Sequence, residues 1–319
     1  MRNSADSYDP AHGRVRRAKS KRQRKQYDEE TFAKRDWHLP RLAAEDADDA
    51  TYGLPEGDRW STWDQSTPTE RGPRPHPKWL VTELAAVDTE LGVIKTGKEA
   101  DVFLLRRGVP GTGRSCLLAA KRYRDATRRL FHRDAGYLEG RRTRDTRVTR
   151  AAANRTAFGK QTIAGQWANA EFNALCQLHD AKVPVPYPVQ ITGTEVLLEF
   201  IGTADGAAAP RLAECALRGA ELTGLWEQLV EAMGTLAGLG LAHGDMSAYN
   251  LLVHDGKLII IDTPQVVDVI ANARGAELLD RDAANVASWF AARHLPVVAG
   301  GVPGPEELAV FLRAEAGLR

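Results

Sequence analysis

The most regular hydrophobic pattern in the chain lies between residues 222 and 237, where apolar side chains recur every three or four positions. This spacing places them on one face of an α-helix and predicts a helix that buries that face in a core. The same period occurs in segments 166–179 and 277–294, and segment 305–312 is expected to form a short closing helix. The second half of the chain is therefore predicted to be mainly helical.

Shorter apolar runs, separated by turn signals, predict β-strands at residues 91–94, 117–123 and 196–202. Runs of this length favour strands over helices when glycine or polar residues flank them. A short helix is expected at residues 78–86, ahead of the first strand. Further along, Asp255-Gly256 between two apolar strands is a tight-turn signal and predicts a hairpin over residues 251–261.

Residues 1–76 differ from the rest of the chain because they lack sustained hydrophobic periodicity. They combine a basic block at 14–25, an acidic patch at 45–49 and stretches rich in proline and glycine. Such a segment buries too little apolar surface to offset the entropy of ordering, so we expect a disordered tail, in which Trp60 and Trp63 are candidates for docking. The folded part is expected to form a β-rich lobe over 77–201 and a mainly helical lobe over 202–319.

Length and composition favour one soluble, two-lobed domain. With 319 residues and 43% hydrophobic content, the chain can bury a large core. Cys116, Cys176 and Cys215 are scattered without metal-ligand spacing, which favours a reducing cytoplasm over a secreted setting. There is no apolar run long enough to span a bilayer and no signal-peptide pattern, so a cytoplasmic protein with no membrane partner is expected.

The net charge of +1 conceals an asymmetry along the chain. Residues 1–190 contain 35 Lys and Arg against 25 Asp and Glu, whereas residues 191–319 contain 8 against 17. Within the basic part, the arginine-rich segment 124–165 lacks clear periodicity and is predicted to be a mobile functional loop. Basic segments of this kind either form a solvated face or bind a polyanion, for which RNA is the natural candidate.

The strongest chemical signal is His243-Gly244-Asp245-Met246-Ser247-Ala248-Tyr249-Asn250, followed by the hairpin and Asp262. Asp245 is suited to orienting or deprotonating an attacking hydroxyl group, and the oxygens of Asn250 and Asp262 are hard ligands suited to Mg²⁺. The hairpin folds Asp262 back towards Asn250. The alternative is a buried histidine with two acids that cap turns, which the full spacing of the motif disfavours.

A second signal joins a strand to a helix. Lys121 lies among apolar residues in the strand 117–123, where a lysine needs a partner. Glu171, on the helix 166–179, is the best candidate, because a lysine held by a helical glutamate is how kinase-like sites direct an ammonium group at phosphates. Gly97, at the turn before the strand that starts near residue 100, would let backbone N–H groups approach a phosphate, although a single glycine in a hairpin is more often just a turn.

Taken together, these motifs resemble the RIO family of atypical protein kinases over residues 78–294. The resemblance rests on TGKEADVF at 96–103, the Lys121 strand, WANAEF at 167–172, the HGDMSAYN loop, IDTPQ at 261–265 and LLDRDAANVASWF at 278–290. The chain is most similar to the branch of the family that lacks a winged helix, and it resembles a bacterial-like member of that branch. The fold implied is α+β and protein-kinase-like, with a small β-rich N-lobe, a mainly helical C-lobe and a disordered N-terminal tail.

The resemblance also implies roles for individual residues. Asp245 would be the catalytic residue, and Asn250 with Asp262 would hold the metal, Mg²⁺ or Mn²⁺. Lys121 would bind the triphosphate of ATP and Glu171 would position Lys121. The remaining ATP-binding positions are Thr96, Gly97, Lys98, Glu99, Ala100 and Val102 around the phosphates, and the backbone of Glu199 and Ile201 at the adenine.

The implied activity is Mg²⁺–ATP-dependent serine/threonine protein phosphorylation, on a protein substrate or on the chain itself, in the setting of small-ribosomal-subunit maturation. The short segment between Asp262 and the next helix leaves little room for a peptide platform, so weak activity on free peptides is expected. Two alternatives remain open. One is a small-molecule phosphotransferase of the aminoglycoside-kinase type, and the other is an ATP-gated switch that binds ribosomes or RNA.

Overall fold

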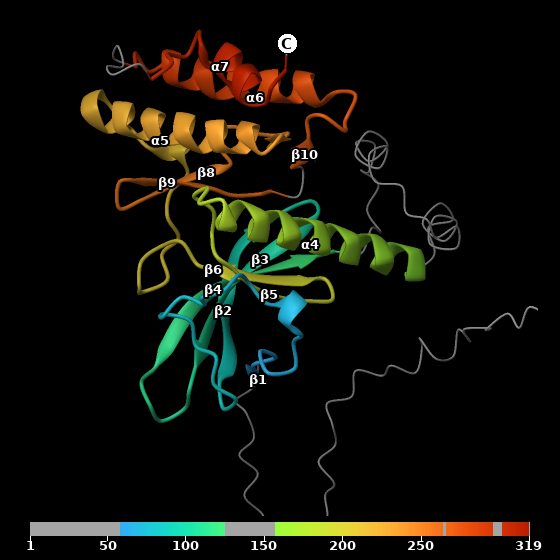
Figure 1. Ribbon diagram of the computed structural model, residues 1–319. Coiled ribbons are helices and arrows are strands. Elements are labelled where there is room, and N and C mark those ends of the chain that lie inside the picture. Colours follow the sequence, from blue (N-terminus) through green and yellow to red (C-terminus); the bar gives the residue numbers. More distant parts are fainter. Residues whose placement is uncertain (1–57, 125–156, 264–265, 296–301, 319) are drawn as a thin grey trace, which may run out of the picture. The chain divides into compact units, whose positions relative to one another are not determined.

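The computed structural model describes residues 58–124, 157–263, 266–295 and 302–318, which form part of one compact unit, 54–319 (Figure 1). The predicted tail up to residue 57 and most of the arginine-rich segment lie outside the described residues. Among the described residues, no helix has both the length and the hydrophobicity that a transmembrane span requires.

The first lobe is a six-stranded antiparallel sheet with strand order β1-β2-β3-β4-β6-β5. Its strands are β1 (Asp58–Trp60), β2 (Val87–Thr96), β3 (Ala100–Gly108), β4 (Ser115–Tyr123), β5 (Pro188–Thr192) and β6 (Glu195–Glu199). Side chains alternate between the two faces of each strand. One face packs on Leu80 and Trp63, and the other on Phe172 of the helix α4 (Ala157–Asp180).

The second lobe is mainly helical, as the 3.6-residue periodicity predicts. Its elements are η3 (Leu212–Glu214), α5 (Gly219–Gly238), β7 (Leu241–Ala242), β8 (Leu251–His254), β9 (Lys257–Ile260), β10 (Val267–Asp268), α6 (Gly275–Ala291) and α7 (Leu308–Glu315). Trp226 of α5 is fully buried and meets Phe290 of α6 edge-on, with ring centroids 5.0 Å apart. The predicted α+β fold with a β-rich N-lobe and a helical C-lobe is confirmed.

The helix α4 contributes to the cores of both lobes. Its Phe172 packs beneath the sheet, whereas Leu175 and Leu178, one and two turns further on, belong to the core of the helical lobe. Residues three positions apart in a helix are neighbours on its surface, so the buried side chains run along α4 from one core to the other. This position brings Glu171 close to β4.

Two expectations for the segment before β2 differ from the structure. Residues 78–86 form isolated turns rather than a helix, in which Leu80 N–H donates to the Pro77 carbonyl and Ala86 N–H to the Glu83 carbonyl. Residues 58–76, which we assigned to the disordered tail, carry β1 and the short η1 (Pro68–Glu70). The physical reason is tertiary: Trp63 and Leu80 dock singly on the sheet, and such docking leaves no periodic pattern.

A buried polar network ties this early segment to the sheet. The Arg107 guanidinium donates to both carboxylate oxygens of Asp88, at 2.6 and 2.9 Å, and to Gln190 Oε1 at 3.0 Å. Gln190 Nε2 in turn donates to Thr62 Oγ1 at 2.8 Å. Because buried polar groups are costly when unpaired, the network requires residue 62 to stay in place.

Candidate active site

The loop from His243 to Asn250 joins β7 to β8 and is held from below by α6. The Asp282 carboxylate accepts hydrogen bonds from Gly244 N–H at 2.7 Å and from Met246 N–H at 2.8 Å. Asn285 Nδ2 donates to the Met246 carbonyl at 3.1 Å. Gly244 has a φ of +81°, which a residue with a side chain adopts only with strain. The loop therefore has a fixed backbone on either side of Asp245.

Asp282 and His243 are both buried beneath this loop. Burial raises the pKa of the Asp282 carboxyl, while His243 and the two backbone N–H groups oppose part of that rise. The His243 ring places Nε2 3.2 Å from the Ile261 carbonyl, which links the loop to the end of β9. The histidine thus serves as a structural connection between the two segments that carry Asp245 and Asp262.

Asn250 is oriented by its amide nitrogen. Its Nδ2 donates to the Asp245 carbonyl at 2.9 Å, and its backbone N–H donates to the Ser247 carbonyl at 2.9 Å. The amide oxygen is then left as the acceptor of this side chain. Ile261 N–H donates to the Asn250 carbonyl at 2.9 Å, so the hairpin does bring Asn250 next to Asp262 in the ladder, as its spacing predicts.

Asp262 follows β9 with a φ of +64°, in the left-handed region. Aspartate tolerates this region better than most residues, and non-glycine residues held there often mark functional sites. Its carboxylate lies 2.8 Å from Lys121 Nζ, which also donates to Glu171 Oε1 at 2.6 Å. Three distant elements, β4, α4 and the end of the hairpin, thus meet at one ammonium group.

The three charges shift one another's titration. Burial alone would lower the pKa of Lys121, but Glu171 and Asp262 outweigh it and raise that pKa well above its usual value. Burial would raise the pKa of Asp262, and Lys121 again outweighs it and lowers that pKa. Tyr123, two residues after Lys121, donates its hydroxyl to Glu171 Oε2. The glutamate, 1% exposed, is therefore held from two sides.

The turn between β2 and β3 carries the predicted phosphate-covering residues. Thr96, Lys98 and Glu99 are exposed, and Gly97 N–H donates to the Ala100 carbonyl at 3.0 Å. A Cβ at position 97 would lie 2.7 Å from the Ala100 carbonyl oxygen, so only glycine fits this tight turn. Val102 of β3 pairs directly with Lys121 of β4, which places its side chain on the same face of the sheet.

The segment after β6 bonds to both lobes. Glu199 N–H donates to the Tyr187 carbonyl at 2.9 Å, and the Ile201 carbonyl accepts from Ala209 N–H at 3.0 Å. An adenine contact in this segment would therefore fall to the Glu199 carbonyl and the Ile201 N–H. Gly202 follows, where a Cβ would lie 2.3 Å from the Ala207 carbonyl oxygen.

The oxygen ligands present suit a metal that shares its coordination with phosphate. The described residues contain no group of three or more His, Cys, Asp or Glu side chains that could hold an ion by themselves. Asn250 and Asp262 would supply one amide oxygen and one carboxylate, which are hard donors of the kind Mg²⁺ uses together with substrate phosphates. The donor chemistry fits the predicted cation.

Asp282 supports the 243–250 loop and is not among the site residues that the sequence predicts. It lies within the motif at 278–290, on the same helical face as the buried Leu279, Ala283 and Val286. A carboxylate on the buried face of an amphipathic helix needs hydrogen-bond donors. That pattern was readable from the sequence, but the identity of the donors, two N–H groups of a loop almost forty residues earlier, was not.

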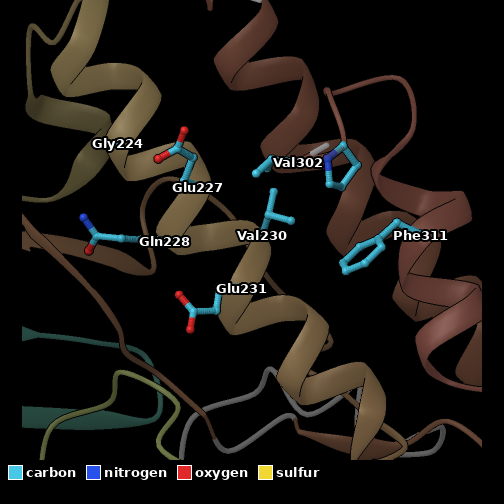
Figure 2. A pocket seen from close by; sticks show the side chains of 8 residues that line it. Gly224, Glu227, Gln228, Val230, Glu231, Val302 and Phe311 are labelled. Atoms are coloured by element: carbon cyan, nitrogen blue, oxygen red, sulfur yellow. The ribbon is translucent and has the colours of Figure 1, made fainter. Parts of the chain in front are cut away.

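A surface pocket of about 620 Å³ lies away from this site, between α5 and the segment that carries α7 (Figure 2). Val230 of α5 and Phe311 of α7 project into the space between the two helices, with Glu227 and Glu231 on the α5 side. Its lining contains none of the predicted catalytic, ATP-binding or metal-binding residues.

The model of one protein family, the RIO domain, matches residues 118–299. The chain is 35% identical over 205 residues to the RIO-type serine/threonine-protein kinase Rio1 of Haloferax volcanii, covering 64% of each chain. It is 32% identical over 211 residues to the serine/threonine-protein kinase RIO1 of Caenorhabditis elegans, covering 65% of this chain and 38% of that protein. It is 30% identical over 154 residues to Rio1 of Thermoplasma acidophilum, covering 48% of this chain and 74% of the relative.

The chain thus spans less than two thirds of the length of the first two of these relatives. The family match covers more than half of the chain and includes Lys121, Glu171, the 243–250 loop, Asp262 and α6. The chain belongs to the RIO domain family.

Proposed function

We propose that the chain is a Mg²⁺–ATP-dependent serine/threonine protein kinase of RIO type. The observation that supports this most strongly is the meeting of Glu171, Lys121 and Asp262 from three elements, at 2.6 and 2.8 Å. A lysine fixed by a helical glutamate beside a strand-end aspartate is the arrangement that phosphoryl-transfer sites use to bind a triphosphate.

In this proposal the residues divide the work between binding and transfer. Lys121 binds the polyphosphate, and Asn250 with Asp262 holds a divalent cation, which neutralises phosphate charge when it is bound. Asp245, on the loop fixed by Asp282, orients the attacking hydroxyl group and takes its proton. The bonds to the backbone N–H groups on either side keep Asp245 in place while its carboxylate, which is only partly buried, faces the incoming substrate.

The segment after Asp262 supports a docked or intramolecular substrate rather than a free peptide. The Asp268 carboxylate accepts from Ile270 N–H and Ala271 N–H, both at 2.8 Å, and so closes a tight turn. The chain then enters α6 at Gly275, where a Cβ would lie 2.2 Å from the Val269 carbonyl oxygen. A segment this tightly folded offers little surface for a peptide, which favours autophosphorylation or a macromolecular substrate.

The proposed macromolecular partner is ribosomal RNA or the small ribosomal subunit, bound through the basic block 14–25 and the segment 124–165. The support is the excess of Lys and Arg in residues 1–190. Binding of this kind releases condensed counterions, so its affinity should fall log-linearly with salt. Binding that is insensitive to salt, or absent at low salt, would remove the nucleic-acid part of the proposal and leave the kinase part.

The deciding experiment incubates the purified protein with γ-labelled ATP and Mg²⁺, with and without small ribosomal subunits, and follows the label. Asp245→Asn should lower the rate of transfer to protein by roughly 10²–10⁴-fold, because it removes the group that acts on the attacking hydroxyl. Its affinity for ATP should stay within several-fold of the wild type, because that group does not bind the ground-state nucleotide.

Lys257→Ala is the matched control, since Lys257 is exposed on β9, beside the Asp255-Gly256 turn, and has no proposed role. Near-normal transfer by Asp245→Asn would remove Asp245 from the mechanism. A label that appears only as free phosphate would replace the kinase by an ATP-gated switch, and a labelled small molecule would point to the other class of phosphotransferase.

A further inference from the structure

A second lysine shares the row of the sheet that carries Lys121. In the antiparallel register, Lys95 of β2 pairs with Val102 of β3, and Val102 pairs with Lys121 of β4. Directly paired residues in such a sheet project from the same face, and adjacent strands are about 4.8 Å apart. The Cα atom of Lys95 is therefore about 9.5 Å from that of Lys121, with both side chains on one face.

That face is the one that looks into the proposed nucleotide site. Lys121 on it reaches Glu171 and Asp262, and Tyr123, two residues along the same strand, packs with Phe172 of α4. Lys95 is the last residue but one of β2, directly before the turn that carries Gly97. Its ammonium group thus emerges beside the turn that is expected to cover the phosphates.

Arg211 approaches the same place from the other lobe. It forms an isolated β-bridge with Leu252, two residues after Asn250, and the neighbouring Pro210 carbonyl accepts from Val253 N–H. Partial burial and the charge of Arg211 lower the pKa of Lys95, Asp262 opposes them, and Lys121 lowers it further. These four groups therefore lie within one another's electrostatic field.

The local charges are not balanced by the protein. Lys121 forms ion pairs with Glu171 and Asp262 at hydrogen-bond distance. Lys95 and Arg211 have no ion pair within 4 Å among the residues that the structure describes. Holding cations near one another costs electrostatic free energy, which an anion placed between them recovers. Lys95 is exposed, so its ammonium group is accessible to a ligand bound in this site.

The geometry points to Lys95, with Arg211 facing it, as a second cationic contact to the polyphosphate chain of the bound nucleotide, on the side of the site away from Glu171. This inference rests on the proposed function, because it assigns a further binding residue to the same site. It predicts that part of the affinity for a triphosphate, and none of that for the nucleoside, depends on residue 95.

The test measures binding of ATP, adenosine and inorganic tripolyphosphate, without a divalent cation and at fixed low salt, by titration calorimetry. Lys95→Ala should weaken ATP and tripolyphosphate by roughly tenfold, the effect of one lost charge-assisted contact, and leave adenosine unchanged. Lys95→Arg, which keeps the charge, should restore most of the loss. Lys257→Ala removes an exposed lysine at the far end of the hairpin, where Gln228 of α5 bonds the Gly256 carbonyl, and should behave as wild type.

The outcomes separate this inference from the function on which it rests. A wild-type protein that binds neither ATP nor adenosine, whether Mg²⁺ is absent or added, would overturn the proposed function and the inference that rests on it. If the wild type binds ATP and Lys95→Ala binds it as tightly as Lys257→Ala does, the inference alone is wrong. An equal loss of adenosine and ATP affinity in Lys95→Ala would also overturn it, because the residue would then be supporting the fold of the lobe.

Discussion

Asp262 combines two constraints that rarely occur in one residue. Its backbone is left-handed, with a φ of +64°, and its carboxylate, 42% exposed, shares the Lys121 ammonium with Glu171. In the proposed site, Lys121 and the metal would therefore share the Asp262 carboxylate. Binding of metal and nucleotide should therefore be coupled, since the phosphates draw Lys121 away from the same carboxylate that the metal requires.

Asp262→Asn tests this coupling without disturbing the backbone, because asparagine also tolerates positive φ whereas alanine does not. In the wild type, Mg²⁺ should strengthen ATP binding. In Asp262→Asn the strengthening should fall by about tenfold or more, because a neutral amide is a weaker ligand than a carboxylate. Parallel titrations of ATP with and without Mg²⁺, repeated with Mn²⁺, measure this effect of the metal on ATP affinity.

Asp255→Asn is the matched control, since Asp255 has a φ of +49° and is exposed at the hairpin turn. It should leave the metal dependence unchanged. An identical Mg²⁺ effect in wild type and Asp262→Asn would remove Asp262 from the metal site.

At the scale of elements, α6 organises the helical lobe on several sides. Asp282 and Asn285 bond the backbone of the 243–250 loop, and Arg281 donates to the Gly244 carbonyl. On another side, Asp280 forms a two-bond ion pair with Arg313 of α7, one bond being 2.7 Å from Arg313 Nε. The helix that supports the proposed catalytic loop is thus itself braced by α7.

The brace predicts a pH-dependent contribution to stability. Hydrogen bonds to Arg313 lower the pKa of the Asp280 carboxyl below its usual value of 3.8, so the ion pair stabilises the fold above pH 3.8 and loses its effect as the pH falls through the folded-state pKa. Because both side chains are more than a third exposed, Asp280→Asn should cost only about 0.5–1 kcal/mol near neutral pH.

Urea unfolding at a series of pH values measures the difference in unfolding free energy between the wild type and Asp280→Asn. This difference should narrow as pH falls below about 4. Glu277→Gln, which removes the more exposed pair with Arg274, is the control and should have a smaller effect at every pH. A difference that stays constant into acid would show that Asp280 acts through packing rather than charge.

In the molecule as a whole, the folded unit includes a segment that precedes residue 77, the predicted start of the β-rich lobe. Trp63, 6% exposed, lies edge-on to His76 at 5.0 Å and beneath the Arg71 guanidinium at 4.9 Å. The buried pair of Arg107 and Asp88 reaches the same segment through Gln190 and Thr62. The segment 58–76 is therefore anchored to the N-lobe, with Trp63 in its core.

Two truncations test this boundary. Deleting residues 1–57 should leave the melting temperature almost unchanged, whereas deleting 1–76 should lower it strongly. The loss of Trp63 alone corresponds to about 3–5 kcal/mol, the usual cost of removing a large buried aromatic side chain. Thermal unfolding by circular dichroism measures both proteins.

Trp63→Ala and Trp60→Ala make a matched pair for the same question, since Trp60 is 46% exposed. The first should destabilise the protein much more than the second. Equal stability of the two truncated proteins would show that residues 58–76 do not contribute to the stability of the folded domain.

The sequence by itself determined the features that depend on local periodicity and spacing. The apolar stripe of α5, the turn at Asp255-Gly256 and the pairing of Lys121 with Glu171 were all predictable, because each follows from a short-range pattern or a single unpaired charge in a strand. Patterns of this kind were sufficient for the α+β fold, whereas the family resemblance came from the motifs at 96–103, 243–250 and 278–290.

Only the tertiary structure decided the features in which one residue finds a distant partner. Lys121 also pairs with Asp262, and Trp63 packs on the sheet. Asp282 accepts hydrogen bonds from the N–H groups of Gly244 and Met246. Lys95 joins the site only through the register of three strands. The physical reason is that hydrogen bonding, burial and charge act over distances in space, and a single aperiodic residue carries no signal of which distant surface will meet it.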